Sequence, residues 1–101
     1  MRPWQDLNQL IEYSSGGVLS RELIKTDKMS VTLFCLAEKT AISDHTATGD
    51  GFVYVIEGEG IFNLAGEAIP MGPAVLIEMP ANAVHSLEAK KNTAFLLILF
   101  K

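Results

Sequence analysis

The sequence predicts an all-β domain, a sandwich or barrel of short strands preceded by one short helix or coil. The 101 residues are enough for one domain. Apolar residues make up 49% of the chain and charged residues 20%, which is typical of a packed globular protein. From Val18 onward, short apolar runs alternate with turn-forming clusters at intervals of about ten residues. We therefore expect a single domain over residues 1–101, with the β-barrel in residues 18–100.

The N-terminal segment contains the only helix that the sequence favours. Asp6 is a suitable N-cap residue. Leu7, Leu10 and Ile11 follow it at spacings of three and four, so they would share one helix face. A Ser-Ser-Gly-Gly run then ends the helical pattern. The alternative is a coil that lies over the barrel and is held by Trp4 and Leu7.

The remaining chain reads as eight or so strands separated by turns. Alternation of apolar and polar residues over 29–37 indicates a half-buried strand. Ala65-Gly66-Glu67 predicts a tight turn, and the polar residues between Asp44 and Asp50 predict a loop at the barrel mouth. The expected strands include residues 18–24, 29–37, 52–56, 61–64, 74–79, 84–89 and 93–100.

The last expected strand, residues 93–100, is apolar on both faces. An exposed strand of this kind would be an aggregation hazard, so something must cover its outer face. We expect either a homodimer or burial under the N-terminal segment.

Charge and cysteine content exclude several classes of function. Twelve acidic residues against eight basic ones give a net charge of −4, which argues against nucleic acid or an anionic membrane as partner. The single cysteine, Cys35, excludes an intrachain disulfide. The N-terminus lacks the apolar core of a signal peptide, and the longest apolar run is too short to span a bilayer. We expect a soluble, cytoplasmic protein.

The two histidines, His45 and His85, are the strongest candidates for site chemistry. Each lies on or beside an expected strand, so a barrel could bring both imidazoles into one pocket. The sequence contains no nucleophile elbow, P-loop or dinucleotide-binding fingerprint. Aromatic residues and methionines on the strands would supply an apolar lining for such a pocket: Phe34, Phe52, Tyr54, Phe62, Phe95, Met71 and Met79.

Around these histidines the chain resembles the cupin superfamily. In the first cupin motif, His45 takes the place of the first histidine, Ala47 of the second and Gly51 of the glutamate, while Lys39 stands at the opening glycine. The stretch that ends at Gly58 is similar to the end of that motif.

The second cupin motif is matched by Pro80 and His85. Asn82 stands where the motif has a glycine, a substitution that fits because asparagine tolerates a positive φ. The resemblance implies a double-stranded β-helix, or jelly-roll barrel.

The resemblance also implies a divalent transition metal, iron, manganese, nickel or zinc, held by three histidines and a glutamate. Only His45 and His85 remain of that set, because Ala47 and Gly51 have no ligating side chain. Strand parity suggests Cys35 or Glu57 as a third ligand, if either faces the barrel interior.

The sequence supports three hypotheses about function. The first is small-molecule binding in a pocket near His45 and His85, with or without a divalent metal. The second is a metal-dependent cupin enzyme of the dioxygenase or isomerase type. The third is a non-catalytic structural or interaction barrel. The pocket residues expected under the first are His45, His85, Ala47, Gly51, Val53 and Val55.

Overall fold

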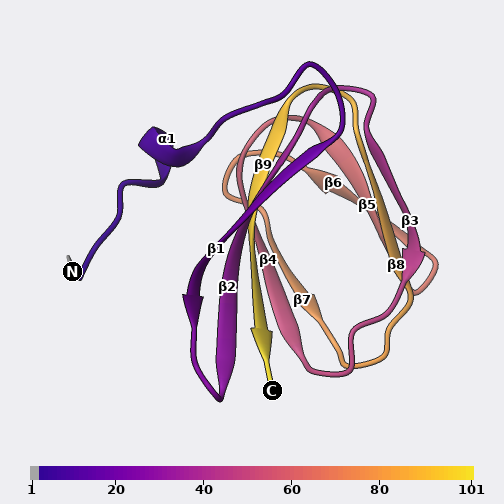
Figure 1. Cartoon of the computed structure of the whole chain (residues 1–101). Helices are drawn as coiled ribbons and strands as arrows, with labels where there is room; N and C mark the ends of the chain where they lie inside the picture. The colour runs from indigo at the N-terminus through magenta and orange to yellow at the C-terminus, as the bar shows by residue number, and fades with distance from the viewer. Residues whose placement is uncertain (1–2) are drawn as a thin grey trace.

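The computed structural model describes residues 3–101 and confirms the all-β prediction. One short helix precedes nine strands in these residues, as Figure 1 shows. No helix in residues 3–101 is long and apolar enough to cross a membrane. The elements are α1 (Leu7–Leu10), β1 (Val18–Lys25), β2 (Met29–Leu36), β3 (Ala41–His45), β4 (Gly51–Glu57), β5 (Gly60–Leu64), β6 (Glu67–Met71), β7 (Leu76–Met79), β8 (His85–Ala89) and β9 (Thr93–Phe100).

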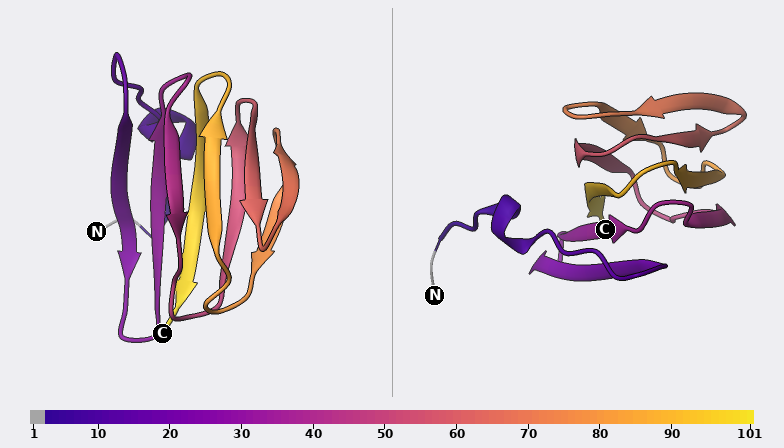
Figure 2. Two further views of the ribbon diagram at one scale, coloured as in Figure 1. Left: turned by 90° about the vertical axis from the view of Figure 1, so that its right-hand side faces the viewer. Right: turned by 90° about the horizontal axis from the view of Figure 1, so that it is seen from above.

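The strands form two antiparallel sheets that face each other in a jelly roll. The five-stranded sheet has the order β1-β2-β9-β4-β7, and the four-stranded sheet has the order β3-β8-β5-β6. Both sheets contribute to the core between them, which is built from Leu36, Val53, Val55, Phe62, Met71, Ile77, Met79, Leu87, Ala89 and Phe95. The views in Figure 2 place α1 outside this barrel, on the side of β1 and β2.

Strand β9 lies at the centre of the five-stranded sheet and is buried on both faces. It pairs with β2 over its whole length and with β4 on its other side. Phe95 packs into the barrel core, whereas Ala94 and Leu96 belong to a second apolar cluster on the outer face. Leu10 and Ile11 pack against this outer cluster. The N-terminal segment is therefore a cover for the outer face of β9, and the homodimer stays a prediction.

Residues 3–13, which we call the N-terminal strap, contain a capped helix and a hydrogen bond to the barrel. The Asp6 carboxylate accepts a hydrogen bond of 3.0 Å from the Asn8 backbone N–H, which confirms the expected helix cap. At the other end, the Tyr13 hydroxyl donates a 2.8 Å hydrogen bond to a carboxylate oxygen of Glu57 on β4. Burial, followed by the hydrogen bond to Glu57, raises the pKa of Tyr13, so the phenol stays protonated as a donor.

Two strands differ from the sequence expectation. Strand β3 occupies residues that we expected in part as a polar loop. Its side chains other than Ile42 are exposed, so it lacks the apolar alternation that identifies a strand. Strand β6 contains Pro70, which reads as a break. It lies at the edge of its sheet, where proline is tolerated because one side of the strand needs no partner.

Several residues other than glycine have a positive φ. The β5–β6 hairpin turns through Ala65 and Gly66, with φ of 48° and 89°, which confirms the expected tight turn. Ala74, before β7, has a φ of 69°, and its N–H donates to the Val55 carbonyl at 2.9 Å. An alanine in this region is strained, because its Cβ crowds the following carbonyl.

We expect Ala74→Gly to raise the free energy of unfolding by about 1 kcal/mol, because glycine removes that strain. Chemical denaturation measures the change. Ala68→Gly on β6 is the matched control, since Ala68 is exposed and has no positive φ. The control should lower stability by about 0.5–1 kcal/mol through added chain entropy. Equal effects of the two substitutions would contradict the argument.

Candidate functional site

His45 and His85 lie side by side across two neighbouring strands. His45 ends β3, His85 begins β8, and the two residues are paired in the sheet register. Their ring centroids are 3.9 Å apart, with the ring planes at 63°. A register irregularity between Ile42 and His45 precedes this pairing. The structure thus brings together the two histidines that the sequence singled out.

The two imidazoles differ in their surroundings. His85 is only 5% exposed and stacks on Phe62, with ring centroids 5.8 Å apart and planes at 7°. His45 is exposed. The pair therefore connects the barrel interior, at His85, with solvent, at His45.

Both imidazoles are oriented by backbone carbonyls. The Nδ1 atom of His45 lies 2.9 Å from the Ser43 carbonyl oxygen, and that of His85 lies 3.0 Å from the Ala83 carbonyl oxygen. A carbonyl can only accept, so each Nδ1 carries the proton. In a neutral imidazole this leaves Nε2 with a free lone pair. The site thus presents two hydrogen-bond acceptors close together.

Burial lowers the pKa of His85 from its usual value of 6.5, because the charged imidazolium loses solvation inside the barrel. The hydrogen bond to the Ala83 carbonyl acts in the opposite direction, and the neighbouring His45 adds to the lowering. At neutral pH His85 is therefore uncharged and acts as an acceptor through Nε2.

A cavity of about 40 Å³ adjoins the two rings inside the barrel. This volume has room for about one water molecule. Apart from the imidazoles its lining is apolar or aromatic, and it comprises Phe34, His45, Val53, Phe62, Met79, His85, Leu87, Phe95 and Leu97. Leu87 and Leu97 are lining residues that the sequence motifs do not indicate. Leu87 could have been found, because it lies two residues after His85 and so shares its face of β8.

The other expected pocket residues lie in different places. Val53 lines the cavity, whereas Val55 belongs to the surrounding core and is not part of the lining. Gly51 is buried at the start of β4 but does not line the cavity either. Ala47 lies in the loop after β3, where its carbonyl accepts a 2.7 Å hydrogen bond from the Asn82 N–H.

The expectation that Cys35 faces the barrel interior is wrong. Cys35 packs with Leu33 and Ala94 in the outer cluster, while its neighbour Leu36 belongs to the barrel core. Alternation shows which residues of one strand share a face, but it does not show which face is inside.

Glu57 is also not a third ligand at the histidine pair. A register shift between Val55 and Glu57 interrupts the alternation of β4, and the exposed Glu57 carboxylate bonds to Tyr13 of the strap. Within residues 3–101 no group of three His, Cys, Asp or Glu side chains could hold a metal ion.

The residues present do not fit a tightly held resident metal. Stable sites hold three or four protein ligands, and here the pair supplies two. Position 51 has no room for a further ligand. A Cβ on Gly51 would lie 2.7 Å from the Ile98 carbonyl oxygen and 2.8 Å from the Leu99 side chain. A carboxylate there would require β4 and β9 to move apart.

Two positions of the motifs keep a left-handed backbone without glycine. Lys39, at the opening position of the first motif, has a φ of 70°, and Asn82, at the glycine of the second, has a φ of 66°. The value at Asn82 confirms the expectation that asparagine replaces glycine in that conformation. The backbone course of both motifs is thus retained where the side chains differ.

The cupin domain profile matches residues 32–100 of this chain. The chain belongs to the cupin family. No curated protein sequence matches it. The match covers the histidine pair and every residue that lines its cavity.

Several solved structures resemble this one closely. A conserved protein of unknown function from Streptococcus pyogenes is 27% identical with a TM-score of 0.89, over 100% of this chain and 89% of that one. A cupin superfamily protein from Desulfitobacterium hafniense is 26% identical with a TM-score of 0.87, over 93% and 86%. A cupin 2 conserved barrel domain protein from Leptotrichia buccalis is 28% identical with a TM-score of 0.86, over 93% and 46%.

We expect Gly51→Ala to lower the free energy of unfolding by about 1–3 kcal/mol, because the added methyl group overpacks the contact between β4 and β9. Thermal or chemical unfolding measures this loss. Gly72→Ala is the matched control, since a Cβ at Gly72 meets nothing within 4 Å. If the Gly51 variant is as stable as the control, β9 can move away from the added methyl group without loss of stability, and the argument is wrong.

Stability should fall as the pH drops below 6.5, the usual pKa of histidine, and the lowered pKa of His85 should contribute to this fall. Below pH 6.5 the unfolded chain binds a proton at His85 more readily than the folded chain does, so a fall in pH favours unfolding. Denaturation of the wild type and of His85→Gln at pH 7.5 and 5.5 tests this. The variant should lose less stability between the two pH values than the wild type does.

Proposed function

We propose that this cupin binds a small molecule through the Nε2 atoms of His45 and His85, without a tightly held metal. The observation that carries the proposal is the pair of Nδ1 hydrogen bonds to backbone carbonyls. They leave a lone pair on Nε2 of each of two neighbouring imidazoles that line an apolar cavity. A few convergent polar groups on an apolar pocket are typical of a ligand site.

Two ring nitrogens with free lone pairs select a ligand that donates hydrogen bonds. An amino or amide nitrogen can donate to both Nε2 atoms, and a hydroxyl group can donate to one. A carboxylate offers no donor, and the uncharged His85 gives it no electrostatic attraction. The cavity volume of about 40 Å³ admits only this small group, so the rest of the ligand would lie over the exposed His45.

The second candidate function is a metal-dependent enzyme of the dioxygenase or isomerase type. The orientation of the imidazoles favours it, because metal-binding histidines also donate their other ring N–H to a carbonyl or carboxylate. The incomplete ligand set disfavours it. The third candidate, a barrel without a ligand, leaves the paired acceptors without a role.

Elemental analysis separates the first two candidates. Untagged protein purified without chelators should hold well under one equivalent of iron, manganese, nickel or zinc per chain. The His45→Ala/His85→Ala variant serves as the reference. About one equivalent in the wild type, lost in the variant, would overturn the metal-free proposal in favour of the enzyme.

Imidazole ¹⁵N shifts test ligand binding directly, because Nε2 responds to a hydrogen-bond donor. We expect 1-propanol at pH 7.5 to shift the Nε2 signals of His45 and His85, and its matched acid, propionate, to leave them in place. His85→Gln should abolish the response at His45 or weaken it several-fold. If the two probes act alike, or if 1-propanol leaves both signals unmoved, the assignment of a donor-bearing ligand fails.

A further inference from the structure

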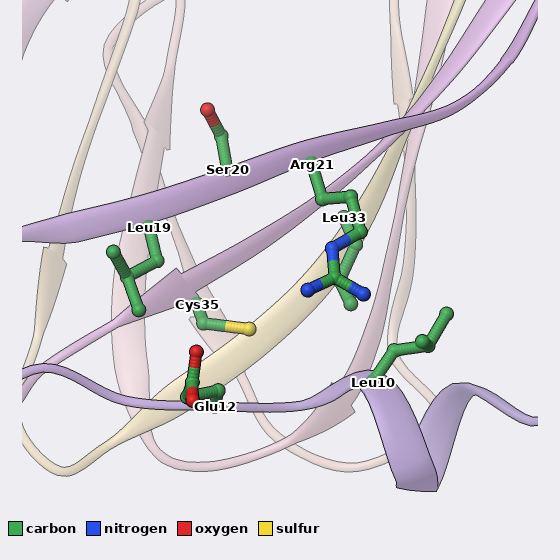
Figure 3. Close-up of a pocket in the computed structure, with 7 residues that line it drawn as sticks. All are labelled: Leu10, Glu12, Leu19, Ser20, Arg21, Leu33 and Cys35. Carbon is green, nitrogen blue, oxygen red and sulfur yellow. The ribbon is translucent and has the colours of Figure 1, made fainter.

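A second cavity, of about 130 Å³, lies on the opposite side of the five-stranded sheet. It is open to solvent on one side and is lined by the N-terminal strap and by strands β1 and β2, as Figure 3 shows. None of its lining residues lines the cavity beside the histidine pair. The cavity is therefore a separate candidate site, and nothing in the cupin motifs describes it.

The register of β1 and β2 builds the wall of this cavity. Leu19 pairs with Cys35 and Arg21 pairs with Leu33, so these four side chains share the outer face of the sheet. The strap adds Leu10 and Glu12 from across the space. The result is an apolar surface with one acidic and one basic side chain at its border.

The two charged groups remain available to a ligand. Figure 3 shows the Glu12 carboxylate and the Arg21 guanidinium on different sides of one space, with the Cys35 sulfur between them. Within residues 3–101 no ion pair joins Glu12 to Arg21. Both side chains are exposed, whereas Cys35 is only 3% exposed. The cavity thus presents a carboxylate and a guanidinium at the border of one apolar wall.

We propose that this cavity binds a small zwitterion, a molecule with a carboxylate and an ammonium group on a short carbon frame. Arg21 binds the carboxylate, since a guanidinium matches its two oxygens. Glu12 accepts from the ammonium, and the leucines contact the carbon frame. The volume equals that of about four water molecules, so the ligand is the size of a short α-amino acid.

Nuclear magnetic resonance of the full ¹⁵N-labelled chain tests the proposal with L-alanine as the probe. We expect saturable amide shifts at residues 19–21 and 33–35. Propionate lacks the ammonium group and ethylamine lacks the carboxylate. Each should bind about tenfold more weakly than alanine, because each forfeits hydrogen bonds to one charged group.

Cysteine alkylation locates the binding, because Cys35 is the single cysteine of the chain and lines this cavity. Alanine at saturation should slow the reaction of Cys35 with iodoacetamide at least several-fold. Propionate and ethylamine at the same concentration should slow it less. Alanine that binds without slowing alkylation would place the ligand elsewhere and overturn the proposal.

Neutral glutamine variants identify the charged groups. Glu12→Gln and Arg21→Gln should each weaken alanine binding about tenfold, at an unchanged unfolding midpoint. Glu22→Gln is the matched control. Glu22 follows Arg21 on β1 and pairs with Thr32, so it points to the other face. Shifts that grow linearly without saturation would refute the proposal, as would a control that weakens binding as much as Glu12→Gln.

Discussion

The structure depends on one strand that must be buried on both faces. Strand β9 is apolar over nearly its whole length, so neither face can be left to solvent without a large hydrophobic cost. Its position between β2 and β4 pairs its backbone with a neighbouring strand on each side. One face then closes the barrel around Phe95, and the other requires the N-terminal strap as a cover. The barrel core thus buries one face of β9, and the strap buries the other.

The two faces of this sheet create two chemically different spaces. On the inner side, the imidazoles of the exposed His45 and the buried His85 line the cavity, with each Nδ1 proton directed to a backbone carbonyl. Outside, Glu12 and Arg21 carry opposite charges at the border of a leucine-lined space. The inner site therefore discriminates by hydrogen-bond polarity and the outer one by charge separation. A single sheet keeps the two from sharing a ligand.

The sequence was informative where a property is local to one strand or turn. Its strong apolar content predicted β9, whose expected bounds of 93–100 match the structure. The cupin motifs were enough to single out the histidine pair. Strand β6 was missed because Pro70 signals a break, and only the sheet order shows that β6 lies at an edge. The inward placement of Cys35 failed because the side of the sheet that becomes the interior depends on pairing between distant strands. The register shifts before His45 and before Glu57 also depend on pairing with distant strands, so the sequence does not reveal them.

The close packing of Gly51 against β9 has a consequence for how this chain can change. Cupin motifs place a glutamate ligand at this position, yet here the backbone of β4 fits so closely against Ile98 and Leu99 that even a methyl group is excluded. A mutation that supplies the ligand would break the contact that holds the central strand, and a mutation that widens the gap would bring no ligand. The first change alone costs stability and the second alone brings no ligand, so a return to the motif needs both together. Sequence drift can move this barrel toward new ligands at its surface more readily than back toward a four-ligand metal centre.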